Sequence, residues 1–227
     1  TWIADQQNIK TFNSSIMVTP EAGIGDRYDK MHRVLYGEYT PLKEELPFLA
    51  SLSPLGDSGG LSKGESAKVF KYRGWNFSPI ICFEDTVPHL VSGIARGANE
   101  SNQSIDVFVN QTNDGWFVHV MDDGSSIGSS ELDQHLITAS FRAVETRTPL
   151  VRAANTGISA VIDGDGVLTE PDVFINGNAE TEADLISTMR DPATGKLRKS
   201  LNAAVITDVP LDSRSSFYVA HGDWFAQ

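Results

Sequence analysis

The sequence predicts an α/β protein in which a mixed β-sheet packs against helices. Residues 105–110 (IDVFVN) are nearly all apolar, which is typical of a strand covered on both faces. Residues 131–147 have the apolar spacing of a helix, and strand-like and helix-like segments alternate through the middle of the chain, with hairpins around them. This alternation argues against an all-β or an all-α domain.

The segment from Glu131 to Arg147 is the clearest predicted helix. Its apolar residues recur on one face of a 3.6-residue period, so this face is expected to pack on the sheet: Leu132, Leu136, Ile137, Phe141 and Val144. Ser129 or Ser130 can cap its first turn, and Pro149 follows its end.

The N-terminal third contains a predicted β-hairpin. Phe12 to Thr19 is a strand, residues 20–26 are turn material with two glycines, and Arg27 to Val34 is a second strand that carries Lys30 and His32. A short helix (residues 43–50), a Gly/Ser-rich loop (51–66) and two paired strands (67–72 and 75–84) are expected to follow.

The C-terminal half continues the alternation. A helix is expected over residues 86–98, and strands over 150–154, 158–162 and 201–209. Residues 172–199 are polar and weakly periodic, so we expect a surface insertion within one domain that spans residues 1–227. The tail from residue 214 to 227 is rich in aromatic side chains.

Bulk composition excludes several classes of function. The 227 residues are 40% hydrophobic and 21% charged, which is ordinary for a globular protein. A net charge of −12 argues against a nucleic-acid-binding surface. No run approaches the roughly 18 apolar residues that span a bilayer. The chain begins with Thr1 and has no signal-peptide pattern, so we expect it to be a piece of a longer protein.

The single cysteine, Cys82, is the most informative residue. It lies at the end of the apolar run WNFSPIICFE, where strand period places Ile80, Cys82 and Glu84 on one side. A free cysteine is most often a buried core residue, and this window by itself favours that interpretation. A thiol at a strand-to-helix turn, in contrast, can reach solvent and react.

Two other kinds of site are set aside. The five histidines are scattered without metal-ligand spacing, and no nucleotide-binding glycine motif is present, so no metal or other cofactor is expected. The motif GDSGG at residues 56–60 resembles the nucleophile motif of chymotrypsin-like proteases. The upstream His32 lacks the context of their general base, and a long helix does not fit their β-barrels, so we interpret the motif as a flexible loop.

A cysteine nucleophile needs a base for its proton and a cation or backbone donors for the developing oxyanion. Lys30 is a candidate for the second task, and Glu38 and Glu84 are candidate supporting carboxylates. All three are equally compatible with ordinary solvated surface charges.

The order and wording of the motifs distinguish these interpretations. RYDKMH (27–32), YGEYTP (36–41) and ICFE (81–84) resemble the carbon–nitrogen hydrolase, or nitrilase, superfamily, which uses a Glu–Lys–Cys triad in that chain order. NDGWF (113–117), QH (134–135) with RAVE (142–145), RAANTGIS (152–159) and GDWF (222–225) make the chain similar to its apolipoprotein N-acyltransferase family. The resemblance extends over residues 12–227.

The resemblance implies a role for each matching residue. Cys82 is the acyl-accepting nucleophile, Lys30 stabilises the tetrahedral oxyanion and favours the thiolate, and Glu38 orients Lys30 or the nucleophile loop. Glu84 matches a carboxylate two residues after the cysteine. Asn13, on the strand before Lys30, together with Asn113 and Trp116 of the NDGWF motif, is a supporting residue.

The sequence also departs from the family pattern. The general-base glutamate of the family lies upstream of the region that matches Thr1, and Glu21, which also follows a proline, lies instead in the hairpin turn. The transmembrane helices of the family have no counterpart here, and Phe83 stands where a tyrosine is common. Residues 118–127 form a local insertion. We therefore expect the 227-residue chain alone to be inactive.

The implied fold is a nitrilase-like α-β-β-α layered sandwich with mixed sheets, lacking its first strand or strands and first helix. The implied activity moves an acyl chain from a phospholipid, through a cysteine thioester, to the N-terminal amine of a diacylglyceryl lipoprotein. The domain would then face the periplasm at the bacterial inner membrane, held by segments absent from this chain, and it would bind no nucleic acid. A soluble amidase of the same superfamily and a non-catalytic binding module are the alternatives.

Overall fold

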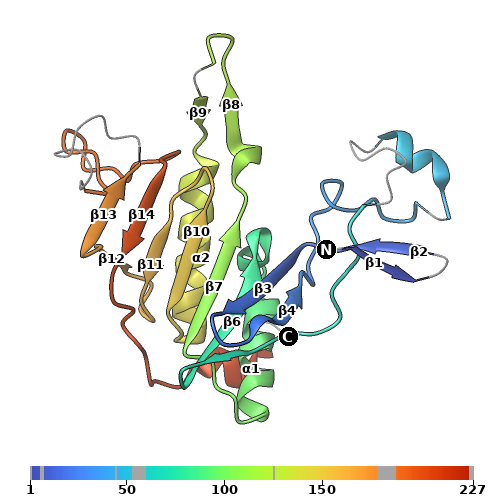
Figure 1. Ribbon diagram of the computed structural model, residues 1–227, viewed down its shortest axis with the longest axis horizontal. Coiled ribbons are helices and arrows are strands. Elements are labelled where there is room, and N and C mark those ends of the chain that lie inside the picture. The colour runs from blue at the N-terminus through green and yellow to red at the C-terminus, as the bar shows by residue number, and fades with distance from the viewer. Residues whose placement is uncertain are drawn as a thin grey trace. The chain divides into compact units, whose positions relative to one another are not determined.

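The computed structural model describes residues 2–5, 8–43, 45–52, 60–124, 126–177 and 188–224. Contacts between residues divide the chain into two compact units, Thr1–Phe70 and Lys71–Gln227, which are described separately below (Figure 1). Most of the GDSGG motif and part of the expected 172–199 insertion lie outside the described residues.

The first unit consists of two antiparallel strand pairs and a short helix. Its elements are β1 (Trp2–Asp5), β2 (Asn8–Thr11), β3 (Ser14–Thr19), β4 (Gly23–Asp29) and the 3₁₀ helix η1 (Pro47–Leu52). The expected β3–β4 hairpin is present, but its second strand begins and ends earlier than the sequence predicted. The strand ends at Asp29, so the prediction that Lys30 and His32 lie on it is wrong. The structure thus places Lys30 just past the strand.

The second unit is built on a six-stranded mixed sheet with the order β12-β11-β10-β7-β6-β5. Its strands are β5 (Phe70–Tyr72), β6 (Trp75–Ile81), β7 (Val107–Thr112), β10 (Leu150–Ala154), β11 (Ala160–Ile162) and β12 (Leu168–Thr169). Strands β6, β7 and β10 run parallel, and β11 and β12 are antiparallel to their neighbours. The α/β class and the mixed sheet predicted from the sequence are confirmed.

Two helices connect the parallel strands. Helix α1 (Pro88–Glu100) joins β6 to β7, and α2 (Glu131–Thr146) lies between β7 and β10. Crossovers between parallel strands are almost always right-handed, which puts both helices on the same face of the sheet. The two helices contact each other, and both lie behind the sheet in Figure 1. The carboxyl ends of β6, β7 and β10 therefore share one edge of the sheet.

Helix α2 has the predicted span, but its buried face differs from the prediction. Leu132 and Leu136 are buried as expected, whereas Ile137 and Phe141 are more than half exposed. Three polar residues, His135, Arg142 and Thr146, lie on the buried face instead. The apolar pattern predicted the position of the helix correctly but the wrong packing face, because we assigned its polar side chains to the solvent-facing side. The Ser129 hydroxyl accepts a hydrogen bond from the Glu131 N–H, so a cap is present.

The remaining elements surround this core. The predicted local insertion, residues 118–127, overlaps a hairpin that projects from the sheet in Figure 1. Its strands are β8 (Val118–Val120) and β9 (Ser126–Gly128). A second antiparallel pair is formed by β13 (Val173–Asn176) and β14 (Ala203–Ile206). A short helix, α3 (Phe217–His221), packs against α1 and α2. Among the described residues, none of the helices is long and apolar enough to cross a membrane.

Adjacent residues on α2 provide a direct test of this packing. We expect Leu136→Ala to lower the free energy of unfolding by about 2 to 5 kcal/mol, because Leu136 is 3% exposed and its removal leaves a cavity. Ile137→Ala is the control, with an expected change within about 0.5 kcal/mol because its side chain faces solvent. Urea denaturation of the two variants measures both values. Equal losses would show that the described face of α2 is wrong.

Candidate active site

The residues predicted to form the site fall in both units. Asn13, Lys30 and Glu38 lie in the first unit, and Cys82 and Glu84 lie in the second. Asn113 and Trp116 also belong to the second unit. Each group is described within its own unit.

In the first unit, Lys30 forms a buried ion pair with Glu38. The Lys30 Nζ atom lies 2.8 Å from Glu38 Oε1, and the lysine is 1% exposed. Asn13 contacts both partners, because its side-chain amide donates to Glu38 Oε1 at 3.4 Å and its carbonyl accepts from the Lys30 N–H at 2.8 Å. Glu38 Oε2 accepts from the Val34 N–H. A buried ammonium requires such a partner, since an unpaired charge is costly to desolvate.

In the second unit, Cys82 occupies a strained turn directly after β6. The strand ends at Ile81, and residues Cys82–Thr86 form a 3₁₀ turn, η2, which we call the Cys82 turn. The expectation of one strand extending to Glu84 is therefore wrong. Cys82 is half-buried and has a φ of +51°, a left-handed conformation that non-glycine residues rarely adopt. Such strain persists only where the surroundings enforce it, and it concentrates at functional sites.

Two polar side chains hold the Cys82 turn. Glu84 is fully buried, and its Oε2 accepts a hydrogen bond from the Ile81 N–H at 2.7 Å, which closes the turn on itself. Asn110, on β7, donates from Nδ2 to the Cys82 carbonyl at 3.3 Å. Glu84 is thus positioned to shape the turn that presents the thiol.

The NDGWF motif lies beside the thiol, as residues 113–117 after β7, which we call the Asn113 loop. The Asn113 carbonyl lies 3.7 Å from Cys82 Sγ. Asn155, after β10, fixes this loop from the other side: its Nδ2 donates to Asn113 Oδ1 at 2.7 Å, and its Oδ1 accepts from the Asp114 N–H at 2.9 Å. Trp116 is 67% exposed. The parallel strands therefore bring the Cys82 turn and the Asn113 loop together at one sheet edge.

Beneath these two segments lies a charged cluster that the sequence did not predict. His135 Nε2 lies 2.8 Å from Asp85 Oδ1, and His135 Nδ1 lies 2.8 Å from Asp114 Oδ1. Arg152 makes the matching pair of contacts, with Nη1 2.6 Å from Asp85 Oδ2 and Nη2 2.9 Å from Asp114 Oδ2. All four side chains are buried. We call these four residues the bridging cluster.

The protonation of the bridging cluster follows from its geometry. A carboxylate only accepts hydrogen bonds, so an imidazole with a carboxylate on each nitrogen must donate from both, and His135 is an imidazolium. Burial alone lowers the pKa of His135, but hydrogen bonds to Asp114 and Asp85 outweigh it and raise the pKa to about 9. Burial raises the pKa of Asp114, but the His135 hydrogen bond and the Arg152 charge hold it below its usual range. Two cations thus balance two carboxylates.

A glycine allows the cluster to close. A Cβ atom added to Gly157 would lie 1.9 Å from Asp114 Oδ2, so any larger residue would collide with the carboxylate. The sequence contains a sign of this cluster, because polar residues stand next to apolar ones in two predicted elements. Arg152 interrupts the strand LVRAA, and His135 lies between apolar positions of α2.

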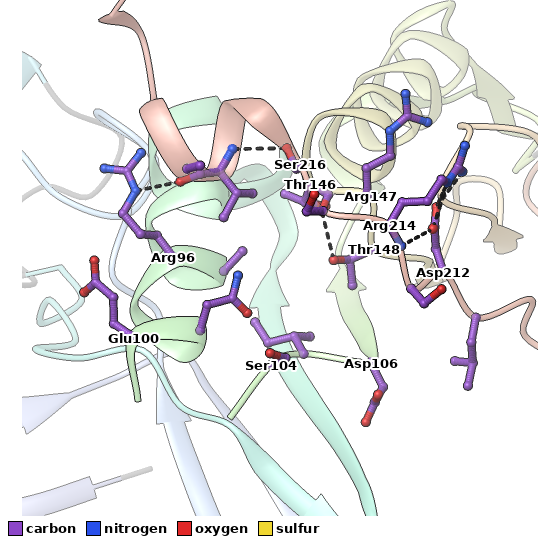
Figure 2. A pocket seen from close by; sticks show the side chains of 18 residues that line it. Arg96, Glu100, Ser104, Asp106, Thr146, Arg147, Thr148, Asp212, Arg214 and Ser216 are labelled. Atoms are coloured by element: carbon purple, nitrogen blue, oxygen red, sulfur yellow. Dashed lines mark hydrogen bonds and ion pairs between the residues drawn. The ribbon is translucent and has the colours of Figure 1, made fainter. Parts of the chain in front are cut away.

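A cavity of about 770 Å³ lies elsewhere in the second unit, and Figure 2 shows its lining. It includes Asp106, just before β7, and Thr148, just before β10, so it lies at the edge of the sheet opposite Cys82. Arg214 points along its wall and is paired with Asp212 at 2.5 Å. A second hollow of about 470 Å³ adjoins Asn155 and has no charged residue in its lining. Within the described ranges, no group of His, Cys, Asp or Glu is arranged to hold a metal ion.

The raised pKa of His135 predicts a pH dependence of stability. A group whose pKa is higher in the folded state stabilises the fold fully below its unfolded value, 6.5, and loses that contribution as the pH rises through about 9. We therefore expect the free energy of unfolding to fall between pH 6.5 and 9, by on the order of 3 kcal/mol.

Denaturation at a series of pH values measures this fall. The variant His135→Gln should have a lower free energy of unfolding than the wild type at pH 6.5, and this free energy should not change between pH 6.5 and 9. His89→Gln, at an exposed position of α1, should show the same pH dependence as the wild type. A flat wild-type profile would show that His135 is neutral in the folded protein.

Comparison with known proteins agrees with this fold. Residues 1–195 match the family model described as carbon-nitrogen hydrolase. The chain is also similar to the crystal structure of a CN-hydrolase superfamily protein from Xanthomonas campestris that carries an arsenic adduct in its active site. The TM-score is 0.51 at 14% sequence identity, over 91% of this chain and 60% of that one. At this identity the similarity supports the fold alone.

Curated relatives are more similar in sequence. The chain is 35% identical over 162 residues to apolipoprotein N-acyltransferase of Geobacter metallireducens, covering 71% of this chain and 28% of the relative. It is 31% identical over 223 residues to apolipoprotein N-acyltransferase 2 of Treponema denticola, covering 95% and 35%. For the enzyme of Rhizobium meliloti the identity is 39% over 160 residues, covering 69% and 27%. The chain spans about a third or less of these relatives. The family match over most of its length shows that this chain belongs to the carbon–nitrogen hydrolase family.

Proposed function

We propose that this chain is the catalytic domain of an apolipoprotein N-acyltransferase, with Cys82 as its nucleophile. The observation that carries the proposal is the strained, half-exposed Cys82 at the end of a central strand, in a chain 31% to 39% identical to enzymes of that name. A partly exposed thiol in a strained turn at the end of a strand fits the role of a nucleophile better than that of a buried core residue. The three curated relatives compared above are all named apolipoprotein N-acyltransferases, which favours this activity over that of an amidase.

In the first half-reaction, Cys82 Sγ attacks the carbonyl carbon of a phospholipid ester. The thiol proton passes to a general base, a C–S bond forms, and a tetrahedral oxyanion develops. When the oxyanion collapses, the C–O bond breaks, and the proton returns to the lysophospholipid alcohol that leaves. The product is an acyl thioester on Cys82.

In the second half-reaction, the α-amine of a diacylglyceryl-cysteine attacks the thioester carbonyl. A C–N bond forms and the C–S bond breaks. The amine proton is transferred through the base to the sulfur, which regenerates the thiol. The donor is a phospholipid and the acceptor is a lipoprotein, and we place the domain on the periplasmic face of the bacterial inner membrane.

Lys30 is proposed to stabilise the oxyanion in both steps. Its ion pair with Glu38, whose carboxylate also accepts a hydrogen bond from Asn13, holds the ammonium in one place, and a fixed charge in a dry site stabilises a transition state more than a mobile one does. Glu38 is then an orienting residue, since both of its oxygens already accept hydrogen bonds. Glu84 shapes the Cys82 turn, Asn113 lines the thiol, and the exposed Trp116 is placed to contact acyl chains.

A thioester at Cys82 is the first expected outcome. In the full-length protein incubated with phospholipid, we expect an acyl adduct that hydroxylamine removes, and we expect Cys82→Ser to lack it. Mass spectrometry before and after hydroxylamine measures the adduct. An unchanged adduct in Cys82→Ser would refute the assignment, and release of free fatty acid without transfer to an acceptor would favour a hydrolase.

The base is proposed to come from outside residues 1–227. Glu38 is committed to Lys30 and to the Val34 N–H, and Glu84 to the Ile81 N–H, so both carboxylates have structural roles. We therefore expect the 227-residue chain alone to form no acyl adduct under conditions in which the full-length protein does. Circular dichroism of the isolated chain is the control for folding. An adduct on the folded, isolated chain would contradict this proposal.

A further inference from the structure

The bridging cluster connects the two segments that meet at the thiol. Asp85 belongs to the Cys82 turn, three residues after the cysteine, and Asp114 follows Asn113 in the neighbouring loop. We infer that His135 and Arg152 are positioning residues that hold the Cys82 turn and the Asn113 loop in one reactive arrangement. This inference rests on the proposed role of Cys82 as nucleophile.

Each cation is shared between the two segments rather than dedicated to one. His135 places one ring nitrogen on Asp85 and the other on Asp114, both at 2.8 Å. Arg152 divides its two terminal nitrogens in the same way. Displacing either segment would therefore break a contact to both cations, so the turn and the loop are coupled.

The cations themselves come from rigid elements. His135 lies on the buried face of α2, and Arg152 lies in the centre of β10, in register with Asn110 of the neighbouring parallel strand β7. Asn110 also ties the Cys82 turn to β7, because its Nδ2 donates to Asp85 Oδ2 at 2.8 Å and to the Cys82 carbonyl. A site supported from helices and strands is held more closely than one supported from loops.

Stability alone is a weak reason for such a cluster. Burying four charges carries a large desolvation cost, and apolar side chains of similar volume often stabilise a core as well or better. The geometry gives another reason. Cys82 is held at a φ of +51°, and the cluster anchors Asp85, three residues further along the same short turn, which helps to enforce the strained conformation.

Misplacement of the nucleophile has a measurable consequence. A shift of about 1 Å in a reacting group can slow a reaction by about 100-fold. A variant that loosens the bridge but leaves Cys82, Lys30 and Glu38 intact is therefore expected to lower kcat for acyl-enzyme formation while KM for the phospholipid changes little.

The test compares His135→Gln and Arg152→Lys with Leu136→Ala in the full-length protein. Glutamine and lysine each retain a donor, but neither can donate to both carboxylates in the same geometry. Leu136→Ala removes a buried apolar side chain from the same helix and leaves every hydrogen bond of the cluster in place, so it controls for lost stability. His89→Gln controls for the substitution itself, at an exposed site.

Two measurements are made on each variant. Hydrogen exchange reports on the Ile81 N–H, whose acceptor Glu84 belongs to the Cys82 turn, and on the Asp114 N–H of the Asn113 loop, whose acceptor is Asn155. We expect the protection of both amides to fall about tenfold further in His135→Gln and Arg152→Lys than in Leu136→Ala. The second measurement is the rate of acyl-enzyme formation, expected to fall about 100-fold in the two cluster variants only.

The outcomes separate the inference from the proposed function. Equal effects in Leu136→Ala and the cluster variants, or a loss of protection in only one of the two segments, would overturn the positioning role. Failure of the wild type to form any thioester would refute the proposed function, whereas the exchange measurements would still decide whether the cluster couples the two segments.

Discussion

The site depends on one constraint, which is that two buried carboxylates from different segments share the same two cations. Without the two cations, Asp85 and Asp114 would repel each other and resist burial. With Arg152 and an imidazolium at His135 between them, the cluster is neutral and its members are within hydrogen-bonding distance. The parallel order of β6, β7 and β10 makes this possible, because it delivers both carboxylates to the same sheet edge.

This charge balance also assigns a role to His135 by exclusion. A histidine close to a cysteine invites the interpretation of a general base, as in other thiol enzymes. Both ring nitrogens of His135 are already committed to carboxylates, and its pKa is raised to about 9, so at neutral pH it holds its protons rather than accepting one from Cys82. The cluster therefore supports the site structurally and electrostatically, and the proton transfer of the proposed chemistry requires another group.

The sequence predicted the elements that local patterns determine. The strand through residues 107–110, helix α2 and strand β10 were all recognisable, because each has the periodicity or apolar content of its type. The end of β6 was missed, since the apolar run continues through Phe83 although the ladder stops at Ile81. A hydrogen bond from the Ile81 N–H to the Glu84 side chain ends the strand, and no periodic pattern encodes such a contact.

The bridging cluster lay beyond prediction for a related reason. Its contacts join residues separated by 21 to 67 positions, so only the folded sheet brings them together. Its trace in the sequence was a conflict at Arg152, because a charged residue interrupts an otherwise apolar strand. Natural sequences tend to break local rules at functional sites. In this chain Arg152 lies in β10, next to β7, and β7 in turn adjoins β6, which ends one residue before Cys82. Charged residues inside a predicted central strand are therefore a reason to look for a partner carboxylate near the neighbouring strand ends.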